Sequence, residues 1–563
     1  MTKNLRFLLQ LLLCAIVLGG CGHATPTPAA TQTATIVPTS TSTATAVPTR
    51  TMPPPTATAT PPLLAYWIDE SVPDGLKKGL NFPSDARAAA QPGEATFRVE
   101  PVQENSGAAR WVYALVTPFP TFTDGVSLKD LQSAWSGEKT GLFEDRPILA
   151  SASTEAALSS ILGEPAVNAV RVIDSGKILD TAWNDKVAWA LGPFEALEPR
   201  WKLLRVDDQS PLDRSLNMDT YPLIVSFGLT GNPEALAFIS DLASKNNQPI
   251  LPATNRDPNK MTTIIMTGVT AMVRATADRM EKKGITYPAQ DIVNWLRDTD
   301  FLHISNEVSF DPDCKPPNAS DPSLFFCSDP KYIGLLEYIH ANIIDLTGNH
   351  QNDFGRQWLL YSLDMYRQQG MMFYASGENL DKARQPITFE HNGNKFAFLG
   401  CNYFGPQQDW ATATEAGTAT CDYDWMTGQI RQLRAEGYLV IVTFQYYESP
   451  SPLPTPDQKA DFRKMIDAGA VIVSGSQAHQ PQAMEFMNDG FIHYGLGNLF
   501  FDQMDKQANR NEYIDRHVFY DGRYIGTVLM TAVLEDYAKP RPATPAERNM
   551  ILGESFKVSG WGQ

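Results

Sequence analysis

The sequence is poor in the side chains that most enzymes use for covalent or metal chemistry. It has 8 histidines and 6 cysteines in 563 residues, and the stretch from Leu63 to Arg256 contains neither type. That stretch offers no histidine-based or cysteine-based catalytic site, so binding, docking or spacing are its expected roles. Positive charge is also scarce, because 46 Lys and Arg stand against 63 Asp and Glu, for a formal net charge of -17. This balance argues against nucleic acid as a partner, since binding its backbone needs a basic surface.

No apolar run is long enough to cross a bilayer comfortably. The run from Phe7 to Leu18 follows two positive charges, Lys3 and Arg6, and is typical of a secretory signal. It ends in Leu-Gly-Gly-Cys21, which resembles the bacterial lipobox, so residues 1–21 are expected to be a lipoprotein signal peptide with Cys21 lipidated. In the alternative, an ordinary secretory signal, Cys21 is incidental. Lipidation predicts an extracytoplasmic protein held at the cell membrane by its acyl chains.

Residues 22–62 almost lack charge. Between His23 and Pro62 the chain is nearly all Thr, Pro, Ala and Ser, and Arg50 is its only charged residue. Such a segment cannot bury enough apolar surface to offset its conformational entropy, and its prolines keep it extended. We expect a disordered stalk that lifts the folded part off the membrane. The roughly 500 residues that follow exceed the usual size of one domain.

Once the signal and Cys21 are set aside, four cysteines remain. The even number fits an oxidising compartment. Pairing neighbours in the sequence, Cys314 with Cys327 and Cys401 with Cys421, would close two short loops. A zinc site is the alternative, although none of the spacings has the C-x2-4-C form.

Residues 63–256 are expected to form a smaller α/β domain. Strand-like runs such as Trp111 to Phe119 alternate with helix-like stretches such as Leu128 to Trp135, which predicts a layered domain with a mainly parallel sheet. The sequence pattern of these strand-like runs weakly resembles one lobe of a type II periplasmic solute-binding protein. Four tryptophans either line a ligand cleft or, more commonly, pack in the core: Trp135, Trp183, Trp189 and Trp201.

Residues 257–540 show a clearer alternation of strands and helices, and residues 541–563 are expected to be a C-terminal tail. The predicted strands are Thr262 to Thr267, Asp300 to Ser305, Ile343 to Thr347, Phe396 to Gly400, Tyr438 to Phe444, Val471 to Ser474 and Phe491 to Tyr494. Polar residues follow several of these strands. In open α/β sheets, ligands bind at the edge where the strands end.

The candidate site residues lie in these strand-end loops. Catalytic roles are predicted for His350, Glu307 and Asn349, and binding roles for Gln445, Glu448, Gln477 and His479. Imidazole can act as a general acid or base, and a carboxylate can position a water molecule. Each residue alone is a weak signal, because a single histidine after a strand is more often structural.

The order of these motifs resembles the CapA family of capsule-biosynthesis (poly-gamma-glutamate) proteins, which belongs to the calcineurin-like metallophosphoesterase superfamily. The resemblance rests on five runs: Ile343 to Gly355 with its Gly-Asn-His, Gly377 to Pro386, Gly393 to Gly400, Gly469 to His479, and Tyr494 to Asp502. It implies a four-layered α/β metallophosphoesterase-like domain. It also implies an association with the export or attachment of poly-gamma-glutamate or a similar polymer.

The sequence departs from the family at positions that would bind metal. The first strand ends in Gly268-Val269 where the family has Gly-Asp, and Gln445 stands where the family has a histidine. The family's Gly-His-His-Pro-His is here Gly-Ser-Gln-Ala-His479, which keeps only its last histidine. A two-metal centre is therefore not expected, because a neutral amide is a poor ligand for transition metals. At most one divalent ion is expected, at Glu307, Asn349 and His479.

Two function hypotheses follow. As an enzyme, the protein would hydrolyse or transfer bonds of an anionic or polysaccharide envelope polymer, with His350 as acid or base. As a non-catalytic lipoprotein with a degenerate metal site, it would bind or tether that polymer. Fold analogy alone does not choose between them.

Overall fold

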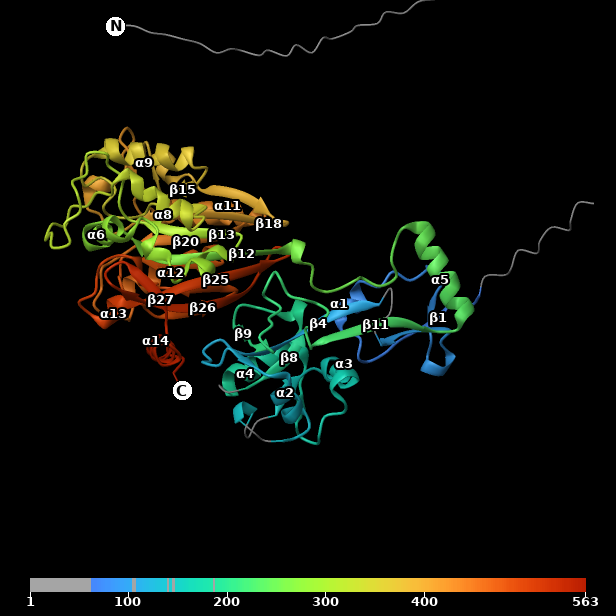
Figure 1. The fold of residues 1–563 in the computed structure, drawn as a ribbon. Helices are drawn as coiled ribbons and strands as arrows, with labels where there is room; N and C mark the ends of the chain where they lie inside the picture. Colours follow the sequence, from blue (N-terminus) through green and yellow to red (C-terminus); the bar gives the residue numbers. More distant parts are fainter. Residues whose placement is uncertain (1–61, 104–107, 139–140, 144–146, 186–187, 563) are drawn as a thin grey trace, which may run out of the picture. The chain divides into compact units, whose positions relative to one another are not determined.

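The computed structural model describes residues 62–562 except 104–107, 139–140, 144–146 and 186–187. The predicted signal peptide, the lipidation site Cys21 and the stalk lie outside these residues. Within the described part of the chain, no helix is both long and apolar enough to span a bilayer. The described residues belong to one compact unit, in which two systems of sheets follow one another along the chain (Figure 1).

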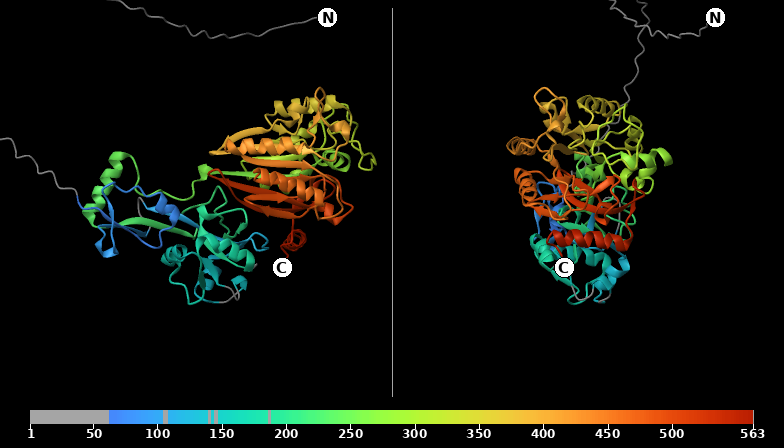
Figure 2. Two further views of the ribbon diagram at one scale, coloured as in Figure 1. Left: turned by 180° about the vertical axis from the view of Figure 1, so that it is seen from behind. Right: turned by 90° about the vertical axis from the view of Figure 1, so that its left-hand side faces the viewer.

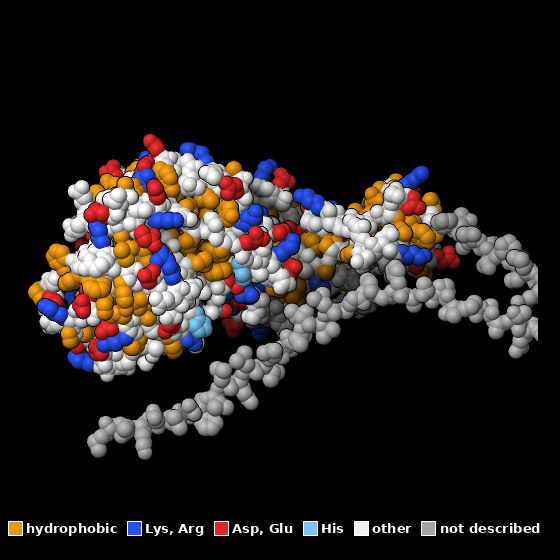
Figure 3. All heavy atoms as spheres, turned by 90° about the horizontal axis from the view of Figure 1, so that it is seen from above, with side chains coloured by type: hydrophobic (Ala, Val, Ile, Leu, Met, Phe, Trp, Pro, Cys, Tyr) orange, Lys and Arg blue, Asp and Glu red, His pale blue; other side chains and the backbone are white. Residues whose placement is uncertain are grey.

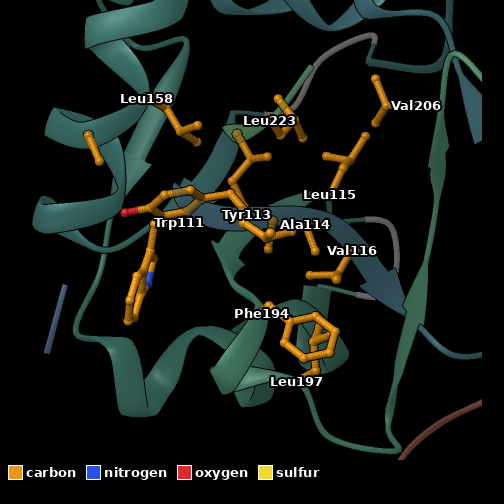
Figure 4. Close-up of a cluster of buried hydrophobic side chains, with 14 of the residues drawn as sticks. Trp111, Tyr113, Ala114, Leu115, Val116, Leu158, Phe194, Leu197, Val206 and Leu223 are labelled. Atoms are coloured by element: carbon orange, nitrogen blue, oxygen red, sulfur yellow. The ribbon is translucent and has the colours of Figure 1, made fainter. Parts of the chain in front are cut away.

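The first system is built around β4 (Ala109–Pro118), a strand whose side chains are buried on both faces. Figure 4 shows Tyr113 and Leu115 of this strand among Leu158, Leu223 and Val206. The nine-stranded sheet also contains β1 (Ala65–Ile68), β2 (Arg87–Ala88), β3 (Phe97–Pro101), β6 (Ile148–Ala150), β7 (Val170–Val172), β8 (Ala190–Pro193), β9 (Trp201–Leu203) and β11 (Ile224–Gly231). Its helices include α1 (Asp74–Lys78), α2 (Leu128–Trp135), α3 (Ala152–Leu162), α4 (Ile178–Asp185) and α5 (Pro233–Asn246).

This sheet is mixed. Strand β11 is antiparallel to both β3 and β4, and β4 is antiparallel to β8. The prediction of a mainly parallel sheet is wrong here, because hydrophobic runs locate strands but do not give their direction. Trp135, Trp189 and Trp201 are buried in the hydrophobic core, and Trp183 packs against it. These four tryptophans therefore serve packing.

The second system is a sandwich of two sheets between two layers of helices, the four-layered arrangement that the sequence predicts (Figures 1 and 2). The first sheet contains β12 (Met261–Thr270), β13 (Phe301–Asn306), β14 (Ile343–Asp345), β15 (Met372–Tyr374), β24 (Asn498–Phe500), β25 (Asn511–Tyr520), β26 (Arg523–Glu535) and β27 (Lys539–Pro542). The second contains β17 (Ile387–His391), β18 (Asn394–Asn402), β20 (Leu439–Gln445), β21 (Ile472–Ser476), β22 (Met484–Met487) and β23 (Gly490–His493).

Helices cover the outer face of each sheet. On the first sheet lie α6 (Arg274–Lys283), α7 (Val293–Arg297), α8 (Ile333–Tyr338) and α9 (Arg356–Gln368). On the second lie α11 (Tyr423–Ala435) and α12 (Pro456–Ala468). Successive residues of each strand face opposite sides of its sheet. In β20, Ile441 faces the other sheet, whereas Val440 and Val442 pack against helices.

The layer between the two sheets also contains a buried polar network. His303 Nε2 lies 2.8 Å from the Tyr374 hydroxyl, which lies 2.9 Å from Thr443 Oγ1. Burial lowers the pKa of His303 to about 3. Burial also raises the pKa of Asp345 to about 6, against the lowering effect of hydrogen bonds from Thr347 and Thr443. Burial therefore favours the uncharged form of both groups more than water does, which makes stability depend on pH.

The end of the chain holds more structure than the sequence indicates. The hairpin of β25 and β26 continues the first sheet, because β25 pairs with β12 along its length. The segment expected to be a tail contains α14 (Pro545–Val558), which Thr544 and Glu547 start with a capping box. Ile551, Leu552 and Phe556 of this helix complete the core between the sheets.

Candidate functional site

The candidate site lies where neighbouring strands of both sheets end. Glu307 directly follows β13, Gln445 is the last residue of β20, and Gln477 directly follows β21. Ser305 and Ser476, whose hydroxyl oxygens are 3.3 Å apart, bring the ends of the two sheets together. Glu307 lies two residues beyond Ser305, so the alternation of the strand points it toward the other sheet as well.

The amide nitrogen of Gln445 is the centre of the site. Gln445 Nε2 donates to Glu307 Oε1 at 2.6 Å and to Asn349 Oδ1 at 2.8 Å, and it also contacts Gln477 Oε1. All four side chains are buried, with Gln445 at 0% and Glu307 at 2% exposure. Three oxygens from three different loops therefore converge on one amide group.

A chain of hydrogen bonds leads from this centre to His350. Asn349 Nδ2 lies 3.3 Å from His350 Nε2, and His350 Nδ1 lies 2.7 Å from Asp353 Oδ2. Burial alone would lower the pKa of His350, but the bond to Asp353 and the negative charge of Glu307 raise it above its ordinary value. His350 is thus an imidazole oriented on both sides, with Nδ1 facing the Asp353 carboxylate and Nε2 facing the Asn349 amide nitrogen.

The second histidine, His479, is fixed by a different partner. Its Nδ1 lies 2.9 Å from Asn498 Oδ1 at the start of β24. Phe501 packs on the His479 ring at 5.3 Å, and Phe326 packs on the His350 ring at 4.4 Å. The guanidinium of Arg274 lies over both phenyl rings, at 4.8 and 5.2 Å.

The structure brings together most of the predicted residues. Glu307, Asn349, His350, Gln445 and Gln477 form one hydrogen-bonded cluster. His479 lies at the end of the same turn as Gln477 and is connected to His350 through the aromatic rings and Arg274.

Glu448 does not join this cluster. It is exposed and has no hydrogen bond or ion pair with the cluster among the residues that the structure describes. The loop after β20 turns outward after Tyr446, which is buried, so a residue close to Gln445 in sequence is carried to the surface.

Sequence reasoning assigned no role to three residues that hold the site in place: Asp353, Asn498 and Arg274. Asp353 lies three residues after His350 within the Gly-Asn-His run, and this spacing was an available signal. Arg274 forms a two-point ion pair with Asp502, through Nε at 3.2 Å and Nη2 at 2.5 Å. Nothing in the local sequence pairs these two residues, which are 228 positions apart.

Both expected cysteine pairs are disulfides in the structure, Cys314–Cys327 and Cys401–Cys421. The first closes the loop that carries Phe326 onto His350. The same Phe326 donates its backbone N–H to Asp353 Oδ2 at 2.7 Å. The loop therefore helps to orient the His350–Asp353 pair.

The residues present do not fit the divalent metal ion that the family resemblance implies. The three oxygens that could bind a cation already surround the amide nitrogen of Gln445 at hydrogen-bond distance. Val269, at the position of the family's carboxylate, lies in an apolar cluster with Phe326 and Phe501. Within the described part of the chain, no group of three or more His, Cys, Asp or Glu side chains is arranged to hold a metal.

The arrangement supports hydrogen bonding and, at His350, proton transfer. The imidazole and carboxylate of His350 and Asp353 are paired as in a general acid or base. Among the described residues, no serine hydroxyl or cysteine thiol is hydrogen-bonded to His350 or His479. An acid or base at His350 would therefore act on water or on the ligand itself.

The fold and the site define a class: a four-layered α/β sandwich with a polar cluster at its strand ends. Residues 263–503 match the family described as "Bacterial capsule synthesis protein PGA_cap". This part of the chain is a domain of the CapA family. The chain is 22% identical over 335 residues to "Capsule biosynthesis protein CapA" of Bacillus anthracis, covering 58% of this chain and 80% of that protein.

Two solved structures are also similar to parts of the chain. The NAD nucleotidase of Haemophilus influenzae has a TM-score of 0.31 and 11% identity, over 52% of this chain and 55% of that one. A putative phosphate ABC transporter substrate-binding protein of Clostridium perfringens has a TM-score of 0.26 and 14% identity, over 33% of this chain and 95% of that one.

Proposed function

We propose that the protein acts outside the cell in the biosynthesis, export or anchoring of a capsule polymer of the poly-gamma-glutamate type, and that it does so by binding the polymer. A lipid on Cys21 would hold it at the membrane, with residues 22–62 as the spacer. The family match supports the polymer class. The two disulfides fit an oxidising, extracytoplasmic compartment.

The observation that carries the binding role is the filled centre of the site. With the Gln445 amide between Glu307, Asn349 and Gln477, the site presents hydrogen-bonding groups in place of a Lewis acid. The face in Figure 3 has acidic and basic side chains interspersed, without a broad field of one sign. Recognition of an anionic polymer would then depend on local hydrogen-bonding groups such as the imidazole of His350, which is partly exposed.

Polymer binding provides the test. For the mature chain, we expect His350→Ala to weaken binding of poly-gamma-glutamate by about tenfold, as loss of one hydrogen bond predicts. Glu448→Ala is the matched control, because Glu448 is exposed and outside the cluster. Affinity would be measured by biolayer interferometry, with an anionic polysaccharide as the second ligand. Equal affinities for wild type and His350→Ala would contradict the proposed role.

A metal-independent hydrolase is the second candidate, favoured by the His350–Asp353 pair and the raised pKa of His350. In that case His350→Ala and Glu307→Gln should each abolish shortening of the polymer, measured by size-exclusion chromatography. Turnover retained in both variants would remove the hydrolase assignment.

A further inference from the structure

We propose that the side-chain amide of Gln445 takes the place of a divalent cation in this site, so that the strand-end loops are held together without metal. The inference concerns the centre of the site and does not depend on polymer binding.

The first argument is the number and type of the contacts. Gln445 Nε2 is within hydrogen-bond distance of oxygens from Glu307, Asn349 and Gln477, and these oxygens come from loops after three different strands. An amide group has only two N–H hydrogens for these three acceptors. Convergence of several hard oxygens, one of them from a carboxylate, on a single electropositive point is the arrangement that proteins use to bind Mg²⁺, Ca²⁺ or Mn²⁺.

The second argument fixes the orientation of the amide. Gln445 Oε1 is buried and has no hydrogen-bond partner among the described residues. Turning the amide by 180° would place this oxygen against the Glu307 carboxylate, which offers an acceptor in any orientation, and would leave the nitrogen without an acceptor. The nitrogen must therefore face Glu307, where it provides the positive end of the amide dipole.

The third argument is what surrounds this point. On the neighbouring strand β12, Val269 is buried at 0% exposure and packs with Val308, Phe326 and Phe501. This apolar cluster supplies none of the further oxygen ligands that a divalent ion would need to complete its coordination. Gln445 thus satisfies the oxygens without adding a net charge.

The substitution Gln445→Glu reverses the hydrogen-bonding character of the central group, from donor to acceptor. It replaces the N–H donor by an oxygen in a side chain of nearly the same shape. Four oxygens, two of them from carboxylates, then meet with no positive group between them. Such a cage should need a cation. The inference therefore predicts that this single change converts a metal-independent site into one that binds Mn²⁺.

The experiment is thermal unfolding of the mature chain in EDTA and in manganese chloride. Wild type should unfold at the same temperature in both. Gln445→Glu should unfold at a lower temperature than wild type in EDTA. Mn²⁺ should raise the unfolding temperature of this variant by about 5 °C or more, because ligands stabilise the state that binds them. Gln482→Glu is the control: Gln482 is buried, and among the described residues its side chain hydrogen-bonds to neutral groups of Ser451 and Gln458. Its unfolding temperature should fall and not respond to Mn²⁺.

Two results would overturn the inference. One is a wild-type chain stabilised by Mn²⁺ as strongly as Gln445→Glu. The other is a Gln445→Glu variant indifferent to Mn²⁺. If this variant does not fold, Gln445→Ala serves in its place, because it leaves the same three oxygens with room for an ion. Mn²⁺ should then raise its unfolding temperature, and no response would again reject the inference.

Discussion

Replacing Gln445 with leucine is expected to lower the free energy of unfolding by about 3–5 kcal/mol. Leucine is similar in size, so the change mainly removes the N–H donor that Glu307, Asn349 and Gln477 share. The buried Glu307 carboxylate then has no hydrogen-bond donor from residue 445. Leaving a buried polar group unpaired lowers the free energy of unfolding by more than the hydrogen bond contributed to it. Chemical denaturation of the variant and the wild type measures the difference.

The control for this prediction is Gln482→Leu. Gln482 is as deeply buried, at 1% exposure, but its hydrogen bonds go to neutral groups of Ser451 and Gln458. We expect a loss of about 1–2 kcal/mol there. Adding Glu307→Met to Gln445→Leu should recover part of the lost stability, because both partners are then apolar. Equal losses for the two glutamines would show that the carboxylate does not depend on Gln445.

The second large effect concerns pH. His303 has a folded pKa of about 3, lowered from 6.5, so the unfolded chain takes up a proton at mildly acidic pH that the folded chain refuses. Between about pH 7 and pH 4 this removes about 3 kcal/mol of stability. Asp345 acts in the opposite direction. Its folded pKa of about 6, raised from 3.8, means that its buried charge is relieved as pH falls, which adds about 2–3 kcal/mol over the same range.

Because the two contributions nearly cancel, neither is visible in the pH dependence of wild-type stability. Single variants should separate them. His303→Gln removes the acid-sensitive group, so its stability should rise toward pH 4 relative to wild type. Asp345→Asn removes the compensating group, so its stability should fall more steeply than that of wild type. Denaturation curves at several pH values would show the two trends, and variants that run parallel to the wild type would contradict this description of the layer between the sheets.

Much of the sandwich could be predicted from the sequence because its central strands are continuous apolar runs. The observed bounds of β13 and β20 each differ from the predicted bounds by one residue at each end. The hairpin of β25 and β26 was missed because its support is distant in sequence: Met261 pairs with Tyr520. Local patterns do not contain such pairings.

The positions of the candidate site residues could be predicted, but their arrangement could not. The rule that polar residues gather at the ends of parallel strands located Glu307, Asn349, Gln445 and Gln477 correctly at one edge. It also placed Glu448 there, although the backbone after Tyr446 carries that residue to the surface. That Gln445 lies at the centre depends on the separation of two sheets, which no local pattern encodes.

Anomalous X-ray scattering from crystals soaked in a manganese salt tests the central claim most directly. Gln445 Nε2 should remain between the oxygens of Glu307, Asn349 and Gln477, with no anomalous peak among them. A manganese peak coordinated by Glu307 and Asn349, with the Gln445 side chain displaced, would contradict the account.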